Sequence, residues 1–277
     1  METVTSADGT VIAFDRHVGG DAGTVILIGG AFSFRKFPKM VEISETLAKQ
    51  YGLTVVNYDR RGRGDSTDTP GEYNVDNEID DIAALIEAVG GSAALFGWSS
   101  GAMLALRAAE SGRVPGISRI VAFEPPFVID RENHVPPADL TTELHALIAA
   151  DRRAETVRFY MNKAMGMPRA MVAVMRFTPY WKGLLATAYS IAHDWAVVEP
   201  FMRGEALRTE DWSHVTVPTQ VISGTKSIPL LRKGAKAIAA VLPDAEHTEL
   251  AKLSHNPSIE ILAPAAAEFL TRAGSDA

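Results

Sequence analysis

Apolar and polar positions alternate along this chain between short strand-like runs and longer helical stretches. Runs rich in β-branched and other apolar residues occupy residues 24–28, 53–58, 93–96, 118–123 and 219–223. Strands buried on both faces of a parallel sheet have this pattern. Between the runs, residues 39–50, 77–89 and 230–242 repeat apolar side chains at helical spacing. The alternation predicts an α/β fold in which a mostly parallel central sheet has helices on both faces.

The two ends of the chain extend this order. Asp8 and Gly9 lie between residues 3–5 and the alternating residues 10–14, which predicts an antiparallel hairpin with a two-residue turn. At the other end, residues 247–250 are typical of a strand and residues 257–272 of a helix. The sheet therefore begins antiparallel and continues parallel.

The alternation is interrupted between residues 128 and 215. This stretch contains helical segments broken by prolines and no run typical of a buried strand. It predicts a helical cap inserted into the α/β core. The chain then divides into a first core part (1–127), the cap (128–215) and a second core part (216–277).

A Gly-x-Ser-x-Gly motif at residues 97–101 joins the run 93–96 to a helical pattern rich in Ala and Leu. A serine between two glycines at such a junction sits on a sharp turn that exposes its hydroxyl. The N-terminus of the following helix would stabilise an anion formed on a substrate there. We therefore interpret Ser99 as a nucleophile. The alternative is a tight turn without catalytic function, because the motif also occurs by chance.

A serine nucleophile needs a base, and histidine suits neutral pH. Of the seven histidines, only His255 lies in a loop between the last strand and a helix that opens with proline. That loop belongs to the same carboxyl edge of the sheet as Ser99, where open α/β sheets bind ligands. We predict His255 as the base, with a surface histidine as the alternative.

Three motifs resemble those of the α/β-hydrolase superfamily. Residues 28–32 stand where the family has its first oxyanion loop, residues 58–66 match its D-x-R-G-x-G-x-S loop, and residues 97–101 match its nucleophile elbow. The resemblance covers nearly the whole chain and implies an α/β-hydrolase fold with a helical cap. It also implies that the backbone N–H groups of Ala31 and Ser100 form the oxyanion hole. A glycine, Gly29, replaces the histidine that commonly precedes Gly30.

The glycine-rich loop at residues 59–66 raises the possibility of phosphate binding. It lacks the Lys-Ser/Thr ending and the spacing of a P-loop. We interpret this loop as structural.

The triad acid departs from the commonest superfamily pattern. The loop after residues 219–223 contains no acid, and Asp244 follows a full helix that should carry it to the opposite edge. Glu124 ends the strand 118–123 at the edge that carries Ser99. Some haloalkane dehalogenases and fungal zearalenone lactonases have the acid at this position, and the lactonases also resemble this chain in the elbow Ser-Ser-Gly-Ala and in a glutamate before proline. The resemblance implies Glu124 as the acid; a purely structural glutamate is the alternative.

The predicted cap is rich in methionine and aromatic residues. Packing is the simpler explanation for Met167, Met171 and Met175 at helical spacing, but a lid must also face the substrate. We expect a hydrophobic small-molecule substrate. The residues expected to line its pocket are Phe32, Trp98, Phe127, Met161, Met165, Tyr180 and Trp181.

Composition narrows the function further. The net charge of −7 argues against nucleic acid as a partner, and the absence of cysteine excludes disulfides and thiol nucleophiles. No histidine spacing suggests a metal site. We expect no metal and no cofactor. No signal peptide and no apolar segment of membrane-spanning length is evident, so we expect a cytoplasmic monomer or homodimer without a membrane partner.

These features favour a cofactor-independent serine hydrolase that cleaves a carboxylic ester or lactone through an acyl-enzyme. Two alternatives stay open. The same triad supports C–C bond hydrolysis or lyase chemistry, and the same fold can serve as a non-catalytic small-molecule receptor.

Overall fold

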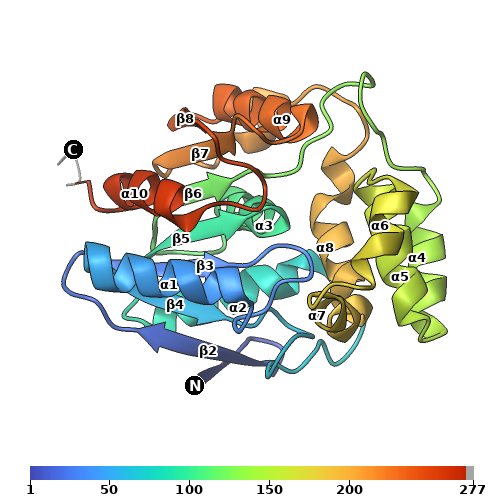
Figure 1. Cartoon of the computed structure of the whole chain (residues 1–277). Coiled ribbons are helices and arrows are strands. Elements are labelled where there is room, and N and C mark those ends of the chain that lie inside the picture. Colours follow the sequence, from blue (N-terminus) through green and yellow to red (C-terminus); the bar gives the residue numbers. More distant parts are fainter. Residues whose placement is uncertain (273–277) are drawn as a thin grey trace.

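A computed structural model describes residues 1–272 of the chain. Its centre is an eight-stranded sheet with the order β1-β2-β4-β3-β5-β6-β7-β8 (Figure 1). The pairs β1–β2 and β2–β4 are antiparallel and all the other pairs are parallel. The strands are β1 (Glu2–Thr5), β2 (Val11–His17), β3 (Thr24–Ile28), β4 (Thr54–Tyr58), β5 (Ala93–Trp98), β6 (Ile117–Phe123), β7 (Thr219–Gly224) and β8 (Ala245–Leu250). The predicted α/β-hydrolase fold is confirmed.

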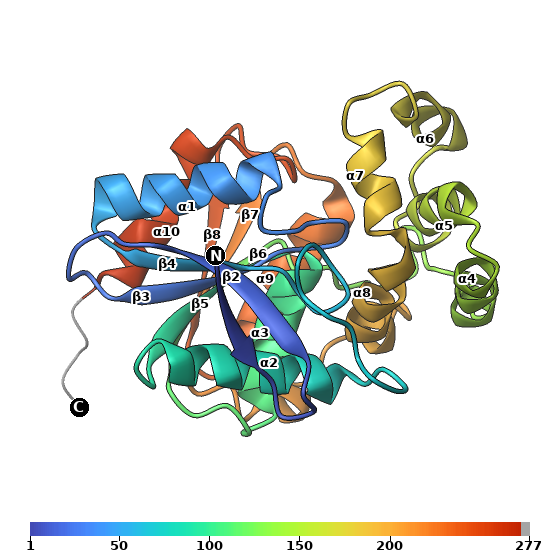
Figure 2. The same ribbon diagram turned by 90° about the horizontal axis from the view of Figure 1, so that it is seen from below.

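Helices cover both faces of the sheet (Figure 2). Helices α1 (Pro38–Tyr51) and α10 (Ile259–Leu270) pack on one face, and α2 (Val75–Ala88), α3 (Ser100–Glu110) and α9 (Pro229–Val241) pack on the other. Successive side chains of the central strands point to opposite faces of the sheet. Ile26 and Leu95 pack in the α2–α3–α9 layer, whereas Leu27 and Phe96 pack in the α1–α10 layer. The apolar runs in the sequence therefore reflect burial on both faces.

The N-terminal hairpin is present, but its loop is longer than the two residues predicted. Thr5 pairs with Val11, so residues 6–10 form the loop. The carboxylate of Asp8 accepts the backbone N–H of Thr10 at 3.0 Å and a hydrogen bond from Arg61 at 2.7 Å. This tertiary contact fixes Asp8 and explains why the Asp-Gly pair does not form a two-residue turn.

The chain between β6 and β7 contains only helices and turns among the described residues. They are α4 (Leu140–Ala149), α5 (Arg153–Phe159), a π-helical turn (Tyr160–Ala164), α6 (Arg169–Met175), α7 (Trp181–Ala186), α8 (Ile191–Val198) and 3₁₀ turns at Ala188–Ser190, Glu199–Phe201 and Thr209–Trp212. Helices α4 to α7 form a lobe beside the sheet layers, and α8 lies between this lobe and the core, where it packs against α3 (Figure 2).

The predicted second core part, 216–277, contains β7, α9, β8 and α10. Its residues 273–277 lie outside the part that the structure describes. None of the helices within residues 1–272 combines the length and the apolar character that crossing a membrane requires.

Candidate active site

Ser99 occupies the turn between β5 and α3. Its backbone has φ 57° and ψ −122°, outside the regions that helices and strands use. A Cβ atom at position 97 would collide with the backbone of Ala102, and one at position 101 with the carbonyl oxygen of Ile28. Only glycine fits at either position, so the two glycines of the motif allow the sharp turn on which Ser99 sits.

The loop after β3 passes close to this turn. A Cβ atom on Gly30 would lie 2.7 Å from the carbonyl oxygen of Trp98 and 3.0 Å from Cβ of Ser99. Among residues 1–272, no protein acceptor takes the backbone N–H of Ala31 or of Ser100. Both donors predicted for the oxyanion hole therefore belong to segments that meet at Ser99, and neither is taken up by a protein acceptor within residues 1–272.

Glu124 follows β6 directly, and its side chain is fully buried. Its Oε1 accepts the backbone N–H of Gly224 at 2.8 Å, and its Oε2 accepts a hydrogen bond from Nδ1 of His255 at 2.6 Å. Gly224 ends β7, after which the commonest superfamily pattern places the acid. The longer glutamate side chain reaches across from β6 to this position.

His255 is held at the same edge by contacts between two loops. The carbonyl oxygen of Leu253 accepts the N–H of Lys226 at 2.8 Å, and the hydroxyl of Thr225 accepts the N–H of Lys252 at 3.0 Å. The imidazole stacks on Phe123 with ring centroids 6.2 Å apart, and its side chain is 33% exposed. The Nδ1 atom of the ring is thus held by Glu124, while the side chain as a whole stays partly exposed.

Ser99 and His255 are not joined by a hydrogen bond in the described part of the chain. Nucleophile–base hydrogen bonds are often long in enzymes without substrate and shorten in the complex. Asp244 is at the other end of the sheet, because its carbonyl oxygen accepts the N–H of Thr219, the first residue of β7, at 2.9 Å. Its position at the opposite edge agrees with the prediction.

Backbone strain is concentrated at this edge. Five non-glycine residues in the described chain have positive φ, and three of them are Phe32 (62°), Ser99 (57°) and Glu124 (48°). Each such conformation costs roughly 1–3 kcal/mol and persists where the surrounding structure enforces it. Such outliers are common at functional sites, and the cluster coincides with the edge at which the sequence places the candidate site.

Comparison with known proteins identifies the family of the chain. The model of the alpha/beta hydrolase family matches residues 25–268. The chain belongs to this family. A search of curated proteins found no match.

Solved structures of α/β hydrolases cover almost the whole chain. An alpha/beta hydrolase from Sphaerobacter thermophilus DSM 20745 is 40% identical, with a TM-score of 0.87 over 97% of this chain and 99% of that one. A thermophilic esterase from Thermogutta terrifontis is 20% identical (TM-score 0.67, 97% of each chain). An enol-lactonase from Burkholderia xenovorans LB400 is 17% identical (TM-score 0.69, 98% of this chain and 100% of that one). The two less similar structures support the fold alone.

The D-x-R-G-x-G-x-S loop of this α/β hydrolase buries charged side chains beside the site. Arg60 makes two hydrogen bonds of 2.6 Å to the buried Glu78, and Arg60 and Arg63 both contact Asp194 of α8. Burial favours the neutral form of Glu78, but the charge and hydrogen bonds of Arg60 outweigh it and lower the pKa of Glu78 to about 2. Our structural interpretation of the loop did not anticipate Asp194. The sequence offers one signal for Asp194: it is the only acidic residue in the mostly apolar stretch 191–198.

The predicted pocket residues of the core have different environments. Phe32 is buried and meets Tyr160 edge-on at 5.7 Å. Trp98 is partly buried in the α1–α10 layer, 5.8 Å from Phe123. Phe127 is fully buried and packs against two aromatic rings, those of Phe201 and Trp212. Because protein surrounds its ring, Phe127 belongs to the core packing.

The predicted pocket residues of the cap also divide by exposure. Met161 is buried in the apolar cluster that includes the α2–α3–α9 layer. Trp181 is partly buried and packs against the same cluster. Met165 and Tyr180 are exposed, and the ring of Tyr180 lies 6.4 Å from that of Phe37. Of these four predicted pocket residues, Met165 and Tyr180 are therefore the two that protein does not cover.

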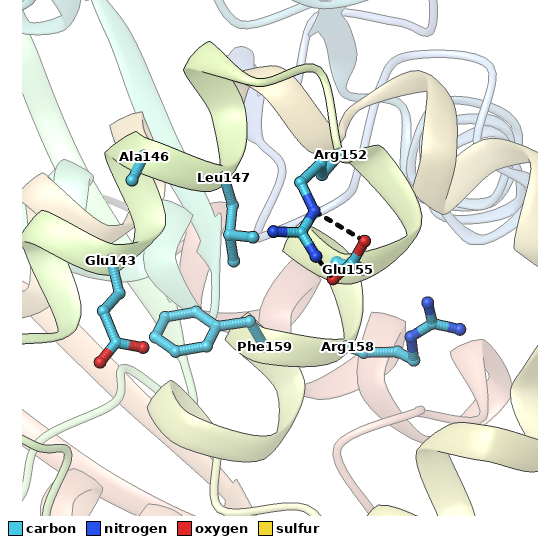
Figure 3. Close-up of a pocket in the computed structure, with 7 residues that line it drawn as sticks. All are labelled: Glu143, Ala146, Leu147, Arg152, Glu155, Arg158 and Phe159. Atoms are coloured by element: carbon cyan, nitrogen blue, oxygen red, sulfur yellow. Dashed lines mark hydrogen bonds and ion pairs between the residues drawn. The ribbon is translucent and has the colours of Figure 1, made fainter.

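Two hollows in the insertion lie apart from this edge. Residues of α4 and α5 line an open hollow of about 460 Å³, in which Arg152 forms an ion pair with Glu155 (Figure 3). Its lining consists of Glu143, Ala146, Leu147, Arg152, Glu155, Arg158 and Phe159. A second, of about 420 Å³, is lined by residues between Pro200 and Trp212. Neither hollow is lined by a residue of the candidate triad or of the predicted oxyanion hole.

Residues 1–272 contain no group of three or more His, Asp or Glu side chains arranged to hold a metal ion. The arrangement at the carboxyl edge instead combines a serine, a histidine fixed by a carboxylate, and two backbone donors. These are the groups that acyl transfer requires.

Proposed function

We propose that the chain is a cofactor-independent serine hydrolase that cleaves a carboxylic ester or lactone of a hydrophobic small molecule. The observation that carries the proposal is the 2.6 Å hydrogen bond from His255 to the buried Glu124 at the edge where Ser99 sits on its strained turn. A carboxylate in this position holds the imidazole in the tautomer that leaves Nε2 free to accept a proton.

In the proposed reaction, Ser99 Oγ attacks the substrate carbonyl carbon while Nε2 of His255 takes the hydroxyl proton. The backbone N–H groups of Ala31 and Ser100 stabilise the oxyanion of the tetrahedral intermediate. The intermediate collapses to an acyl-enzyme, and His255 returns the proton to the leaving alkoxide. A water molecule, deprotonated by His255, then attacks the acyl group and regenerates Ser99.

The cap supports a hydrophobic substrate. It carries Met165 and Tyr180 as exposed side chains, and a flexible methionine adapts to apolar ligands of different shape. An ester or lactone as the bond cleaved agrees with the names of two structures that share the fold, an esterase and an enol-lactonase.

Turnover of a panel of p-nitrophenyl esters and aryl lactones tests the proposal. We expect the wild type to hydrolyse members of this panel and Ser99→Ala to lose roughly 10³-fold or more in kcat, because the nucleophile is absent. Ser111→Ala, at the other end of α3, should keep the wild-type rate. Full activity in purified, folded Ser99→Ala would refute the assignment.

A further inference from the structure

One carboxylate of the insertion contacts the core at the place where the oxyanion donors lie. Asp194 of α8 is fully buried. Its Oδ1 accepts hydrogen bonds from the hydroxyl of Ser100 at 2.7 Å and from Arg60 at 2.6 Å, and its Oδ2 accepts one from Arg63. Ser100 carries one of the two oxyanion donors, so Asp194 contacts that donor's residue directly.

The two arginines extend this contact to the other donor. Arg63 donates to the carbonyl oxygen of Gly30 at 2.9 Å and to that of Ser33 at 3.1 Å, and Arg60 donates to the carbonyl oxygen of Gly29 at 3.3 Å. The Gly30 carbonyl and the Ala31 N–H belong to a single peptide group. Because that group is planar, fixing its oxygen fixes the direction of its N–H. Arg63 therefore orients the second donor.

The charges in this network balance. The guanidinium groups of Arg60 and Arg63 face the carboxylates of Asp194 and Glu78, and all four side chains are buried. Glu78 accepts hydrogen bonds from Arg60 and the hydroxyl of Tyr73 and, within residues 1–272, none from the oxyanion segments, whereas Asp194 accepts from both arginines and Ser100. Loss of the Asp194 charge would leave Arg63 without a carboxylate partner, and the single oxygen of an amide could not accept both from Arg63 and from the pair Ser100 and Arg60.

We propose that Asp194 is a positioning residue for the oxyanion hole, whose carboxylate fixes the two segments that carry the backbone donors. The inference rests on the proposed function. On this inference, the insertion helps to stabilise the transition state through Asp194 of α8. Asp194 acts by positioning the backbone donors and contacts neither the substrate nor the triad.

A purely structural role for Asp194 makes a different prediction, and the chain offers a matched control. Asp81 of α2 is also buried and makes two hydrogen bonds, of 2.7 and 2.8 Å, to Arg61 of the same loop. Arg61 contacts Asp8, Thr69 and Asn77, none of which belongs to the site. Asp81→Asn thus breaks a comparable buried pair without contact to the oxyanion segments.

The test compares Asp194→Asn with Asp81→Asn in the full chain, well below the unfolding temperature of each. The readouts are kcat and KM for a p-nitrophenyl ester and the rate constant of labelling by a fluorophosphonate, whose adduct places a phosphoryl oxygen in the oxyanion hole. Removal of one oxyanion donor typically costs about 10²–10³-fold in kcat, so we expect misplacement in Asp194→Asn to lower kcat and the labelling rate roughly 10–100-fold. We expect KM to change less than about threefold, because the donors act mainly in the transition state.

Ser100→Ala provides a second variant that removes only the direct bond and keeps the backbone donor. It should lower kcat roughly 3–10-fold, the size of effect expected for the loss of one hydrogen bond of typical net strength. If Asp194→Asn does not fold, wild-type kcat in Ser100→Ala overturns the inference. Equal effects of Asp194→Asn and Asp81→Asn, or a change in KM alone, also overturn it. A wild type that neither hydrolyses the esters nor reacts with the fluorophosphonate refutes the proposed function and, with it, this inference.

Discussion

Both carboxylate oxygens of Glu124 are occupied, one by the N–H of Gly224 and the other by His255. The first bond holds the carboxylate at the end of β7. The loop after β7 has no acid of its own, and Glu124 takes the place of that acid. The second bond directs the negative charge of a fully buried carboxylate at the imidazole, and burial of the carboxylate makes the interaction stronger than it would be in water. At the residue scale, the proposed mechanism therefore depends on the charge of Glu124 as well as on its shape.

The variant Glu124→Gln keeps the size of the side chain and removes this charge. The amide can donate to His255 and hold the wrong tautomer, so kcat should fall by up to ~10⁴-fold while the protein remains folded. Asp244→Asn, at the opposite edge, should keep the wild-type rate. Steady-state kinetics of both variants, with circular dichroism as the folding control, decide the matter. Loss of activity in Asp244→Asn alone would show that the acid is misplaced.

The position of Glu124 could be predicted because strand order alone brings the ends of β6 and β7 to one edge. Asp194 could not, because its bonds to Ser100 and Arg60 join residues 94 and 134 positions apart, and no local pattern encodes such contacts. Phe127 shows the same limit. It is among the residues predicted to line the pocket, but Phe201 and Trp212 from a distant part of the chain pack against it.

At the element scale, strands were easier to predict than helix starts. The run 24–28 coincides with β3, because a short, continuous run of apolar residues is typical of a strand buried on both faces. Helix α1 begins one residue before the predicted residue 39 because Pro38 fits the first turn, where its missing N–H is not needed. Helix α2 begins at Val75 instead of residue 77 because the side chain of Asn74 caps it by accepting the N–H of Asp76. Local capping chemistry thus shifted the ends but not the order of elements.

The close passage of the loop after β3 over the elbow gives a test at this scale. Gly30→Ala would place a Cβ atom 2.7 Å from the Trp98 carbonyl oxygen and displace the loop that carries the Ala31 donor. We expect kcat to fall at least tenfold and stability to fall by about 1–3 kcal/mol, as for other overpacked sites. The measurements are turnover and thermal unfolding.

Gly71→Ala is the matched control for this substitution. A Cβ atom at position 71 has no atom within 4 Å, so activity and stability should stay at wild-type levels. A wild-type kcat in Gly30→Ala would show that the loop accommodates the extra methyl group without displacing the Ala31 donor. This result would contradict the close packing of the loop against the elbow.

At the scale of the whole molecule, buried ion pairs connect the N-terminal hairpin, the loop after β4, α2 and the insertion. Arg61 joins Asp8 of the hairpin to Asp81 of α2, and Arg60 joins Glu78 of α2 to Asp194 of α8. These pairs hold parts that are distant in sequence, so the stability of the fold should depend on their ionisation.

The lowered pKa of Glu78, about 2 against an ordinary value of 4.5, gives this dependence a sign. The folded state binds this proton less readily than the unfolded state, so the stabilisation is complete above pH 4.5 and is lost as the pH falls towards 2. Thermal unfolding between pH 2 and 7 should show a steep decline below pH 4.5. Glu78→Gln should destabilise the fold at pH 7 by about 3–5 kcal/mol, since it breaks a buried pair, and flatten the decline. As a control, Glu72→Gln at an exposed carboxylate should leave the dependence of thermal stability on pH unchanged. If Glu78→Gln and the wild type lose stability in parallel as the pH falls, this account is contradicted.

The central claim is that Ser99 is a nucleophile activated by His255, and the site of covalent modification tests it most directly. The measurement is peptide mass spectrometry after reaction with a fluorophosphonate. The account predicts one adduct per chain, on the peptide that contains Ser99, which is absent in Ser99→Ala and forms roughly 10³-fold more slowly in His255→Ala. An unmodified Ser99, or an adduct on a different residue that persists in Ser99→Ala, would contradict it.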